Sequence, residues 1–205
     1  CKRSSGRDAL DYDECLFTTL GLDRRLIKAV SALRYVRPTR VQSRCIPVAL
    51  QQKDVMVRAR TGSGKTIAFS LPLIQVVLTA IENHDGVEGI RAVIIVPTHE
   101  LCEQIYEVIV SLLRFCGDIL SVYHISGDSS MSSQIPRLKE LPHILVATPS
   151  RLSAHLSRKN IVLKDSLKIL VIDEADLILS FGYENDLKSI IDFLPKFHQS
   201  MLMSA

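Results

Sequence analysis

No two cysteines in this sequence have the spacing of a metal-binding or redox motif. The five cysteines lie at positions 1, 15, 45, 102 and 116, and no Cys-x-x-Cys pair occurs. An odd number of scattered cysteines, without a secretory signal at the N-terminus, argues against a zinc site or a disulfide framework. We therefore expect free thiols and an intracellular, reducing compartment.

Long apolar runs are also missing. The longest, residues 67–81, is interrupted by Ser70, Pro72 and Gln75, so we expect no membrane-spanning segment. The formal net charge is only +3. It permits RNA binding without indicating it, because charge must be concentrated on one face to attract a polyanion. The hydrophobic content of 47% in 205 residues is enough for one domain with a substantial core.

The two ends of the sequence predict an excised piece of a longer protein. The chain begins with Cys1 rather than methionine, and its first 14 residues are mostly polar or charged. We expect residues 1–14 to form a disordered tail and residues 15–205 to form one domain. We also expect a second domain of the parent protein to be absent from this chain.

Short apolar segments alternate with segments of helical spacing through most of the chain. In residues 22–33, apolar side chains recur at 22, 26, 27, 30 and 33, which is the spacing of one helix face. The alternation predicts an α/β fold in which a mainly parallel sheet is covered by helices on both faces. Strands are predicted at 54–59, 91–96, 120–125, 143–147, 168–172 and 200–204, and helices at 22–33, 38–46, 65–81, 99–115, 130–140, 150–157 and 183–193.

The segment Ala59-Arg-Thr-Gly-Ser-Gly-Lys-Thr66 has the composition of a loop that binds phosphate. Gly62 and Gly64 permit backbone conformations in which successive N–H groups turn inward around an anion. A helix that starts near Lys65 adds its free amides and the positive end of its dipole. The Lys65 ammonium can reach the β- and γ-phosphates, and the Thr66 hydroxyl can ligate magnesium.

One position of this loop departs from the phosphate-loop pattern, because Ala59 stands where the pattern has glycine. The alternative interpretation is a Gly/Ser turn before a helix whose lysine is merely solvated. The apolar strand before the loop and the apolar helix after it favour the phosphate-binding interpretation.

The segment Asp173-Glu-Ala-Asp176 directly follows the apolar run 169–172. In a parallel α/β sheet, ligands bind at the carboxyl ends of the strands. A buried strand can there present Asp173 to a magnesium ion and Glu174 to an attacking water. Acidic clusters otherwise often form a solvated helix start. Together the two segments predict hydrolysis of a nucleoside triphosphate, with Lys65, Asp173 and Glu174 as catalytic residues and Thr66 and Asp173 as magnesium ligands.

The segment Arg34-Tyr-Val-Arg-Pro-Thr-Arg-Val-Gln42 then resembles the adenine-recognising Q motif of the DEAD-box RNA helicases. The resemblance implies a RecA-like domain that binds ATP and Mg²⁺, in which Gln42 hydrogen-bonds adenine and Tyr35 stacks on its ring. Arg34 stands where the family usually has glycine. Without the neighbouring Pro38 and Thr39, Gln42 would read as a surface helix residue. The implied nucleotide-contacting residues are Phe17, Tyr35, Gln42, Ala59, Arg60, Thr61, Gly62, Ser63, Gly64, Lys65 and Thr66.

Three further segments resemble the motifs with which this family holds the backbone of one RNA strand. Pro97-Thr-His-Glu-Leu101 has His99 in place of arginine, Ser126-Gly127-Asp128 stands where a Gly-Gly pair is usual, and Thr148-Pro-Ser-Arg151 has serine in place of glycine. His99 lacks the permanent charge and rigid fork of arginine, so its phosphate contact should be weaker near neutral pH. Each segment taken alone could be an ordinary strand-to-helix turn. The implied RNA-contacting residues are Pro97, Thr98, His99, Gly127, Thr148 and Arg151.

The end of the chain, Met203-Ser204-Ala205, resembles the start of the family's Ser-Ala-Thr motif. The resemblance implies that Ser204 and Asp176 couple the nucleotide site to RNA. Arg60 and residues 176–183 resemble the branch that assembles the large ribosomal subunit. This implies a nuclear, nucleolar location, with pre-ribosomal proteins as possible partners.

Two other functions stay open at the level of sequence. One is a phosphate-loop kinase or another translocase, and the other is an RNA clamp in which ATP gates binding without turnover. The resemblance implies that a second RecA-like domain of the same protein supplies arginines to the γ-phosphate. We therefore expect the isolated chain to bind nucleotide and RNA but to be nearly inactive as a hydrolase.

Overall fold

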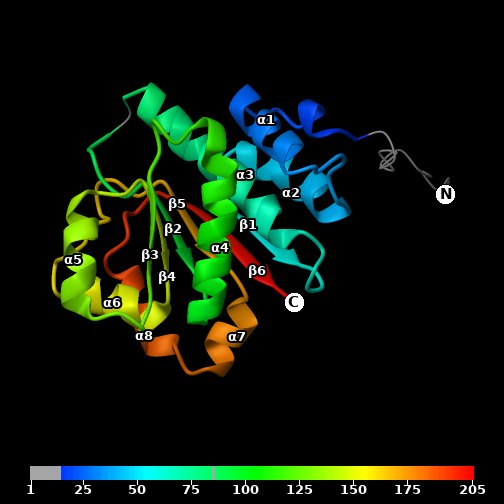
Figure 1. Cartoon of the computed structure of the whole chain (residues 1–205). Helices are drawn as coiled ribbons and strands as arrows, with labels where there is room; N and C mark the ends of the chain where they lie inside the picture. The colour runs from blue at the N-terminus through cyan, green and yellow to red at the C-terminus, as the bar shows by residue number, and fades with distance from the viewer. Residues whose placement is uncertain (1–14, 85) are drawn as a thin grey trace, which may run out of the picture.

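The computed structural model describes residues 15–84 and 86–205, and its six strands form one sheet with helices on both faces (Figure 1). Every pair of neighbouring strands is parallel, which confirms the expected α/β architecture. The expected disordered tail, residues 1–14, lies outside the described residues. The strands are β1 (Val55–Arg58), β2 (Ala92–Ile95), β3 (Val122–Ile125), β4 (Ile144–Ala147), β5 (Ile169–Ile172) and β6 (Gln199–Ser204).

Each helix expected from the apolar spacing is present within a few residues of its predicted bounds. A further helix, α7, is not predicted by the spacing, because its six residues are too short for a helical repeat to be visible. The helices are α1 (Arg24–Ala32), α2 (Arg40–Leu50), α3 (Lys65–Glu82), α4 (His99–Leu112), α5 (Met131–Lys139), α6 (Pro149–Ser157), α7 (Ala175–Ser180) and α8 (Glu184–Ile191), with 3₁₀ turns η1 (Phe17–Thr19) and η2 (Leu113–Phe115).

Two apolar cores lie on the two faces of the sheet, because successive side chains of a strand point to opposite sides. In β2, Ala92 and Ile94 pack toward α1, α2, α3 and α4. Val93 and Ile95 pack toward α5, α6 and α8. Helix α3 is long and apolar enough to cross a membrane by length and composition, but 67% of it is buried inside the protein. It is the central helix of the core that α1, α2, α3 and α4 form against one face of the sheet.

Helix α3 runs through Pro72 without interruption. Proline has no N–H, so the carbonyl of Ala68, four residues earlier, loses its helical partner. The thiol of Cys45 in α2 lies 3.7 Å from that carbonyl oxygen and donates to it. Burial raises the pKa of the Cys45 thiol to about 11. It therefore stays protonated and serves packing, as expected for the free cysteines; all four cysteines in the described part of the chain are free.

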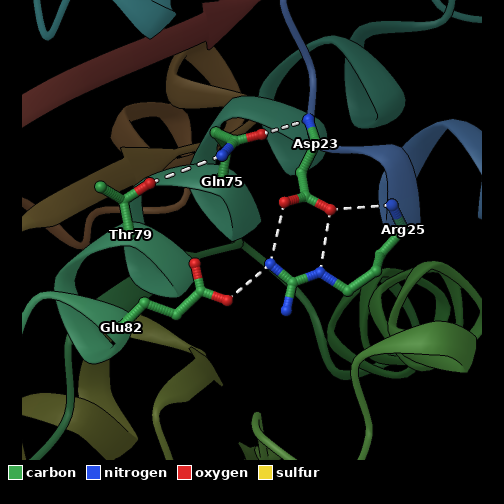
Figure 2. A network of polar contacts seen from close by, with 5 residues as sticks. All are labelled: Asp23, Arg25, Gln75, Thr79 and Glu82. Carbon is green, nitrogen blue, oxygen red and sulfur yellow. Dashed lines mark hydrogen bonds and ion pairs between the residues drawn. The ribbon is translucent and has the colours of Figure 1, made fainter.

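A network of polar contacts fastens α1 to α3 (Figure 2). The Arg25 guanidinium binds both carboxylate oxygens of Asp23, at 2.9 and 2.8 Å, and also reaches Glu82 at 2.7 Å. The Asp23 N–H donates to the side chain of Gln75 at 2.7 Å. Hydrogen bonding to Arg25 lowers the pKa of the Asp23 carboxyl below its ordinary value. The segment that carries Phe17 and Tyr35 is thus anchored to the helix that follows the phosphate loop.

The strand order β1-β6-β5-β2-β4-β3 divides the carboxyl edge of the sheet into two halves. The phosphate loop follows β1, Ser204 ends β6 and the acidic segment follows β5. The three segments that resemble RNA-binding motifs follow β2, β3 and β4. Arg58 pairs with Ser204, Ile172 pairs with Leu202, and Ile95 pairs with both Ala147 and Ile172. The ends of β1 and β6 therefore reach two residues past those of β5, β2 and β4. All of these segments therefore lie along one edge, with the residues expected to contact nucleotide beside those expected to contact RNA.

Arg34, which stands where the related motif has glycine, adopts φ 60°. Helix α1 ends here with the Tyr35 N–H donating to the Val30 carbonyl and the Arg34 N–H to Ser31, a pattern that places its terminal residue in the left-handed region. The loop geometry that glycine would favour is therefore preserved by an arginine, at a cost in conformational energy.

Replacing Arg34 with glycine should raise the free energy of unfolding by about 0.5–1 kcal/mol, because glycine accepts positive φ without steric strain. Urea denaturation of the two proteins measures the difference. Arg158→Gly is a matched control, since Arg158 ends α6 with φ −87° and glycine there only adds freedom to the unfolded chain. The control should be destabilised. A loss of stability in Arg34→Gly as well would show that φ strain is not the controlling factor.

Candidate nucleotide-binding and RNA-facing site

The phosphate loop turns sharply between β1 and α3. Gly62 and Gly64 have φ 79° and 90°, as the sequence leads one to expect for a backbone that wraps an anion. A Cβ at Gly64 would lie 2.5 Å from Nε2 of Gln42, so a side chain there would displace Gln42. Ala59 is not among the residues with positive φ. Alanine therefore fits where the pattern has glycine, and the loop keeps its shape.

Lys65 lies at the first position of α3 with only 6% of its surface exposed. Its ammonium donates to the carbonyl oxygens of Ala59 at 2.9 Å and Ser204 at 3.3 Å, and it pairs with the Glu174 carboxylate at 3.2 Å. One cation thus joins the phosphate loop, the end of β6 and the acidic segment. The expected catalytic residues Lys65 and Glu174 are in direct contact.

Asp173 is buried at the end of β5, with 5% of its surface exposed. Burial, together with the neighbouring Glu174 charge, raises the pKa of the Asp173 carboxyl to about 6, although the Glu174 N–H donates to it at 3.0 Å. Glu174 itself adopts φ 49° and ψ 50°, a left-handed conformation that is costly for a side-chain-bearing residue. The acidic segment therefore combines a buried carboxyl at Asp173 with a strained backbone at Glu174.

Asp176 and Ser204, the residues expected to couple the two halves of the site, are also in contact. The Ser204 hydroxyl donates to the Asp176 carboxylate at 3.1 Å. Asp176 lies in the first turn of α7, so this hydrogen bond ties that helix to the end of β6.

The residues expected at the adenine ring divide into two groups. Phe17, Arg34 and Tyr35 line a pocket of about 310 Å³, in which Phe17 is buried and Tyr35 is 43% exposed. Gln42 is not among the residues that line this pocket. The structure therefore brings the two aromatic residues to one pocket, while Gln42 contacts the phosphate loop.

Gln42 joins the Q-motif helix to the phosphate loop. Its Oε1 accepts the Thr39 N–H at 2.9 Å, and its Nε2 donates to the Gly64 carbonyl at 3.2 Å. The Thr39 hydroxyl donates to the Ser63 carbonyl at 2.9 Å. Thr39 was not among the expected site residues, although its Thr-x-x-Gln spacing is that of a helix capping box, which the structure contains. One Nε2 hydrogen and one Oε1 lone pair of Gln42 remain for a ligand.

The three RNA-facing segments meet at the other half of the edge. Thr98 caps α4 by accepting the Leu101 N–H at 3.3 Å, and Thr148 precedes Pro149 at the start of α6. The Arg151 guanidinium donates to the Gly127 carbonyl at 3.0 Å. His99 contacts the Ser126 hydroxyl at 2.9 Å. Pro97, Thr98, His99, Gly127, Thr148 and Arg151 all come from the three segments 97–101, 126–128 and 148–151, which these contacts join.

The phosphate loop and the acidic segment fit a bound nucleotide with magnesium. The Ser63 hydroxyl is buried without a hydrogen-bond partner, and a buried polar group of this kind calls for one. The left-handed glycines leave the loop open at Gly62, where a Cβ would meet nothing within 4 Å. A buried carboxylate at Asp173 provides the hard oxygen ligand that Mg²⁺ prefers.

Asp173→Asn should stabilise the protein at pH 8 in the absence of magnesium. The folded-state pKa of about 6 exceeds the ordinary value of 3.8, so the stability that this carboxyl contributes is complete below about pH 4 and is lost as pH rises through 6. The free energy of unfolding of the asparagine variant should therefore exceed that of the parent by about 1–3 kcal/mol at pH 8 and should differ little from it near pH 4. Chemical denaturation at both pH values measures this. The exposed Asp165→Asn is the control, and a gain independent of pH would contradict the assignment to Asp173 ionisation.

Comparison with known proteins agrees with this geometry. Residues 39–205 match the family model described as DEAD/DEAH box helicase. A Dictyostelium discoideum protein named "Probable ATP-dependent RNA helicase ddx56" is 45% identical over 202 residues, which cover 98% of this chain and 29% of that protein. A Schizosaccharomyces pombe protein named "ATP-dependent RNA helicase dbp9" is 42% identical over 201 residues, covering 98% of this chain and 34% of that protein.

A solved structure gives the same result at the level of the fold. The crystal structure of a DEAD box protein from the hyperthermophile Methanococcus jannaschii matches with a TM-score of 0.83 and 35% identity, over 93% of this chain and 50% of that one. The chain spans about a third of the length of the curated relatives it matches. The family match includes the phosphate loop, the acidic segment and all three RNA-facing segments, and the chain belongs to the DEAD/DEAH-box helicase family.

Proposed function

We propose that this chain is the ATP-binding RecA-like domain of an ATP-dependent RNA helicase. The observation that carries the proposal is the contact of the Lys65 ammonium with Glu174 at 3.2 Å and with the Ser204 carbonyl at 3.3 Å. It joins three motifs that would otherwise be separate turns. The names of the relatives, which describe ATP-dependent RNA helicases, support the same activity.

The residues of the nucleotide half divide the chemistry among them. When bound, ATP and Mg²⁺ supply the phosphoryl group and neutralise part of its charge. The amides of residues 59–64 and the Lys65 ammonium would hold the β- and γ-phosphates, while Thr66 and Asp173 would hold the metal. Glu174 takes a proton from the attacking water. Its contact with Lys65 at 3.2 Å orients this carboxylate.

The residues of the RNA half hold the backbone of one strand. Thr98, Gly127 and Thr148 offer hydroxyl and amide groups, and Arg151 offers a permanent cation. Such groups bind phosphate and sugar without reading bases. Asp176 and Ser204 connect this half to the nucleotide half through their hydrogen bond of 3.1 Å. A second RecA-like domain of the longer protein completes the grip and supplies arginines to the γ-phosphate.

We also propose that the protein acts in assembly of the large ribosomal subunit in the nucleolus, among pre-ribosomal proteins. The support is the resemblance of Arg60 and of residues 176–183 to that branch of the family. Two apolar side chains of residues 176–183, Leu179 and Phe181, are 53% and 54% exposed.

Two substitutions separate nucleotide binding from turnover. Lys65→Ala should weaken ATP binding at least tenfold, because it removes the cation that meets the phosphates. Glu174→Gln should leave affinity within about threefold of the parent, because it removes a base rather than a phosphate ligand. Calorimetric titration of this chain with Mg²⁺ and ATP measures both, and the exposed Lys139→Ala is the control.

Glu174→Gln also tests the role of Glu174 in turnover by the full-length protein. There it should abolish RNA-stimulated phosphate release while ATP still binds, since an amide cannot accept the proton. Parental turnover by this variant would remove Glu174 from the reaction. A loss of ATP binding in Lys139→Ala would show that the phosphate site is misplaced.

Adenine nucleotides should bind this chain more tightly than guanine nucleotides. The free hydrogen-bonding capacity of Gln42 matches the donor and acceptor of adenine, and a mismatched base leaves buried polar groups unsatisfied. The expected difference is about 1–3 kcal/mol, or roughly 5- to 150-fold in affinity. Titration with ADP and with GDP measures it. Equal affinities would exclude Gln42 from base recognition and leave it as the link between α2 and the phosphate loop.

A further inference from the structure

The imidazole of His99 is held by contacts within the protein. Its Nδ1 contacts the Ser126 hydroxyl at 2.9 Å, and its Nε2 contacts two carboxylates. The closer is Asp128, in the loop after β3, and the other is Glu103, one turn along α4, at 3.4 Å. Nε2 must carry the hydrogen that these acceptors share. Both ring nitrogens of His99 are therefore engaged within the protein.

Several ionisable side chains lie near His99. They include Glu100 and Glu103 from α4, Asp128 from the loop, and His124 from β3, whose pKa is lowered by burial. Arg151 from α6 donates to the Gly127 carbonyl of the same loop. The His99 side chain is 32% exposed, and the Asp128 side chain is 59% exposed, so an RNA phosphate can reach both.

The loop is positioned independently of the contact between His99 and Asp128. In α5, Nε2 of Gln134 donates to the Ser126 carbonyl at 2.9 Å. The buried His155 holds Gln134 in place through its Oε1 at 2.8 Å, and Arg151 holds Gly127. Removing the charge of Asp128 should therefore leave the backbone of the loop where it is.

Both residues that meet here lie in segments that depart from the related motifs. His99 stands where the motif has arginine, and Asp128 belongs to the Ser126-Gly127-Asp128 segment, which stands where a Gly-Gly pair is usual. Together they exchange a permanent cation for an imidazole and introduce an anion on the surface that the RNA backbone would approach. Each phosphate that a protein neutralises contributes to affinity through release of counterions, so this pairing lowers the number of such contacts.

We propose that Asp128 is an intramolecular competitor of RNA phosphate for His99, and so sets a weaker and more readily reversed grip at this half of the site. The inference rests on the proposed function, because it takes the RNA backbone to lie along this edge. A phosphate that binds His99 must displace the Asp128 carboxylate. Asp128 thus acts through His99 and determines how strongly the 97–101 segment holds RNA.

The test is binding of a fluorescently labelled, short single-stranded oligouridylate to this chain, followed by anisotropy at several salt concentrations and at about pH 6, where an ordinary imidazole is mostly protonated. Asp128→Asn should increase affinity about five- to tenfold at about 50 mM salt, and should steepen the dependence of log affinity on log salt by about 0.7, the value for one added phosphate contact. The exposed Asp118→Asn, which makes the same change of charge outside the RNA edge, should change neither quantity by as much.

A second background shows whether Asp128 acts through His99. In His99→Ala, the added Asp128→Asn substitution should give less than about a twofold gain and no change of salt slope. Three results would overturn the inference while leaving the RNA edge in place. They are an equal gain in both backgrounds, an equal gain from Asp118→Asn, and RNA binding that Asp128→Asn leaves unchanged. Absence of RNA binding in every variant would instead overturn the RNA edge itself, and the inference with it.

Discussion

The buried ammonium of Lys65 is the group on which the rest of the nucleotide half depends. A cation removed from water must be fully paired and hydrogen-bonded, and its partners here are the carbonyls of Ala59 and Ser204 and the carboxylate of Glu174. They belong to the ends of β1, β6 and β5, which are neighbours in the sheet. Lys65 is therefore satisfied only when these three strands have the correct order and register.

Much of the fold could be predicted from sequence because the central strands β2, β4 and β5 are buried on both faces and appear as short, continuous apolar runs. Helix α7 could not, since six residues do not complete a recognisable repeat. The order of the strands could not either. Local patterns do not specify which strands become neighbours, so the position of β6 between β1 and β5, which brings Ser204 to Lys65, is visible only in the structure.

The candidate site shows the same division between local and distant information. The glycines of the phosphate loop could be predicted because positive φ is a property of single residues. The role of Thr39 could have been inferred from its capping-box spacing, but its hydrogen bond to Ser63 depends on how α2 packs on α3. The contact between His99 and Asp128 joins the start of α4 to the loop after β3, and no spacing in the sequence predicts it.

The two halves of the site differ in the burial of their charged groups. In the nucleotide half the charged groups are buried, so Asp173 and Lys65 tolerate few changes and Glu174 keeps a strained backbone. In the RNA half the charges are exposed and screened by salt, and a substitution there changes affinity by modest factors. A change of charge in the RNA half, such as histidine in place of arginine at position 99, therefore costs less than a change at the buried charges of Asp173 or Lys65.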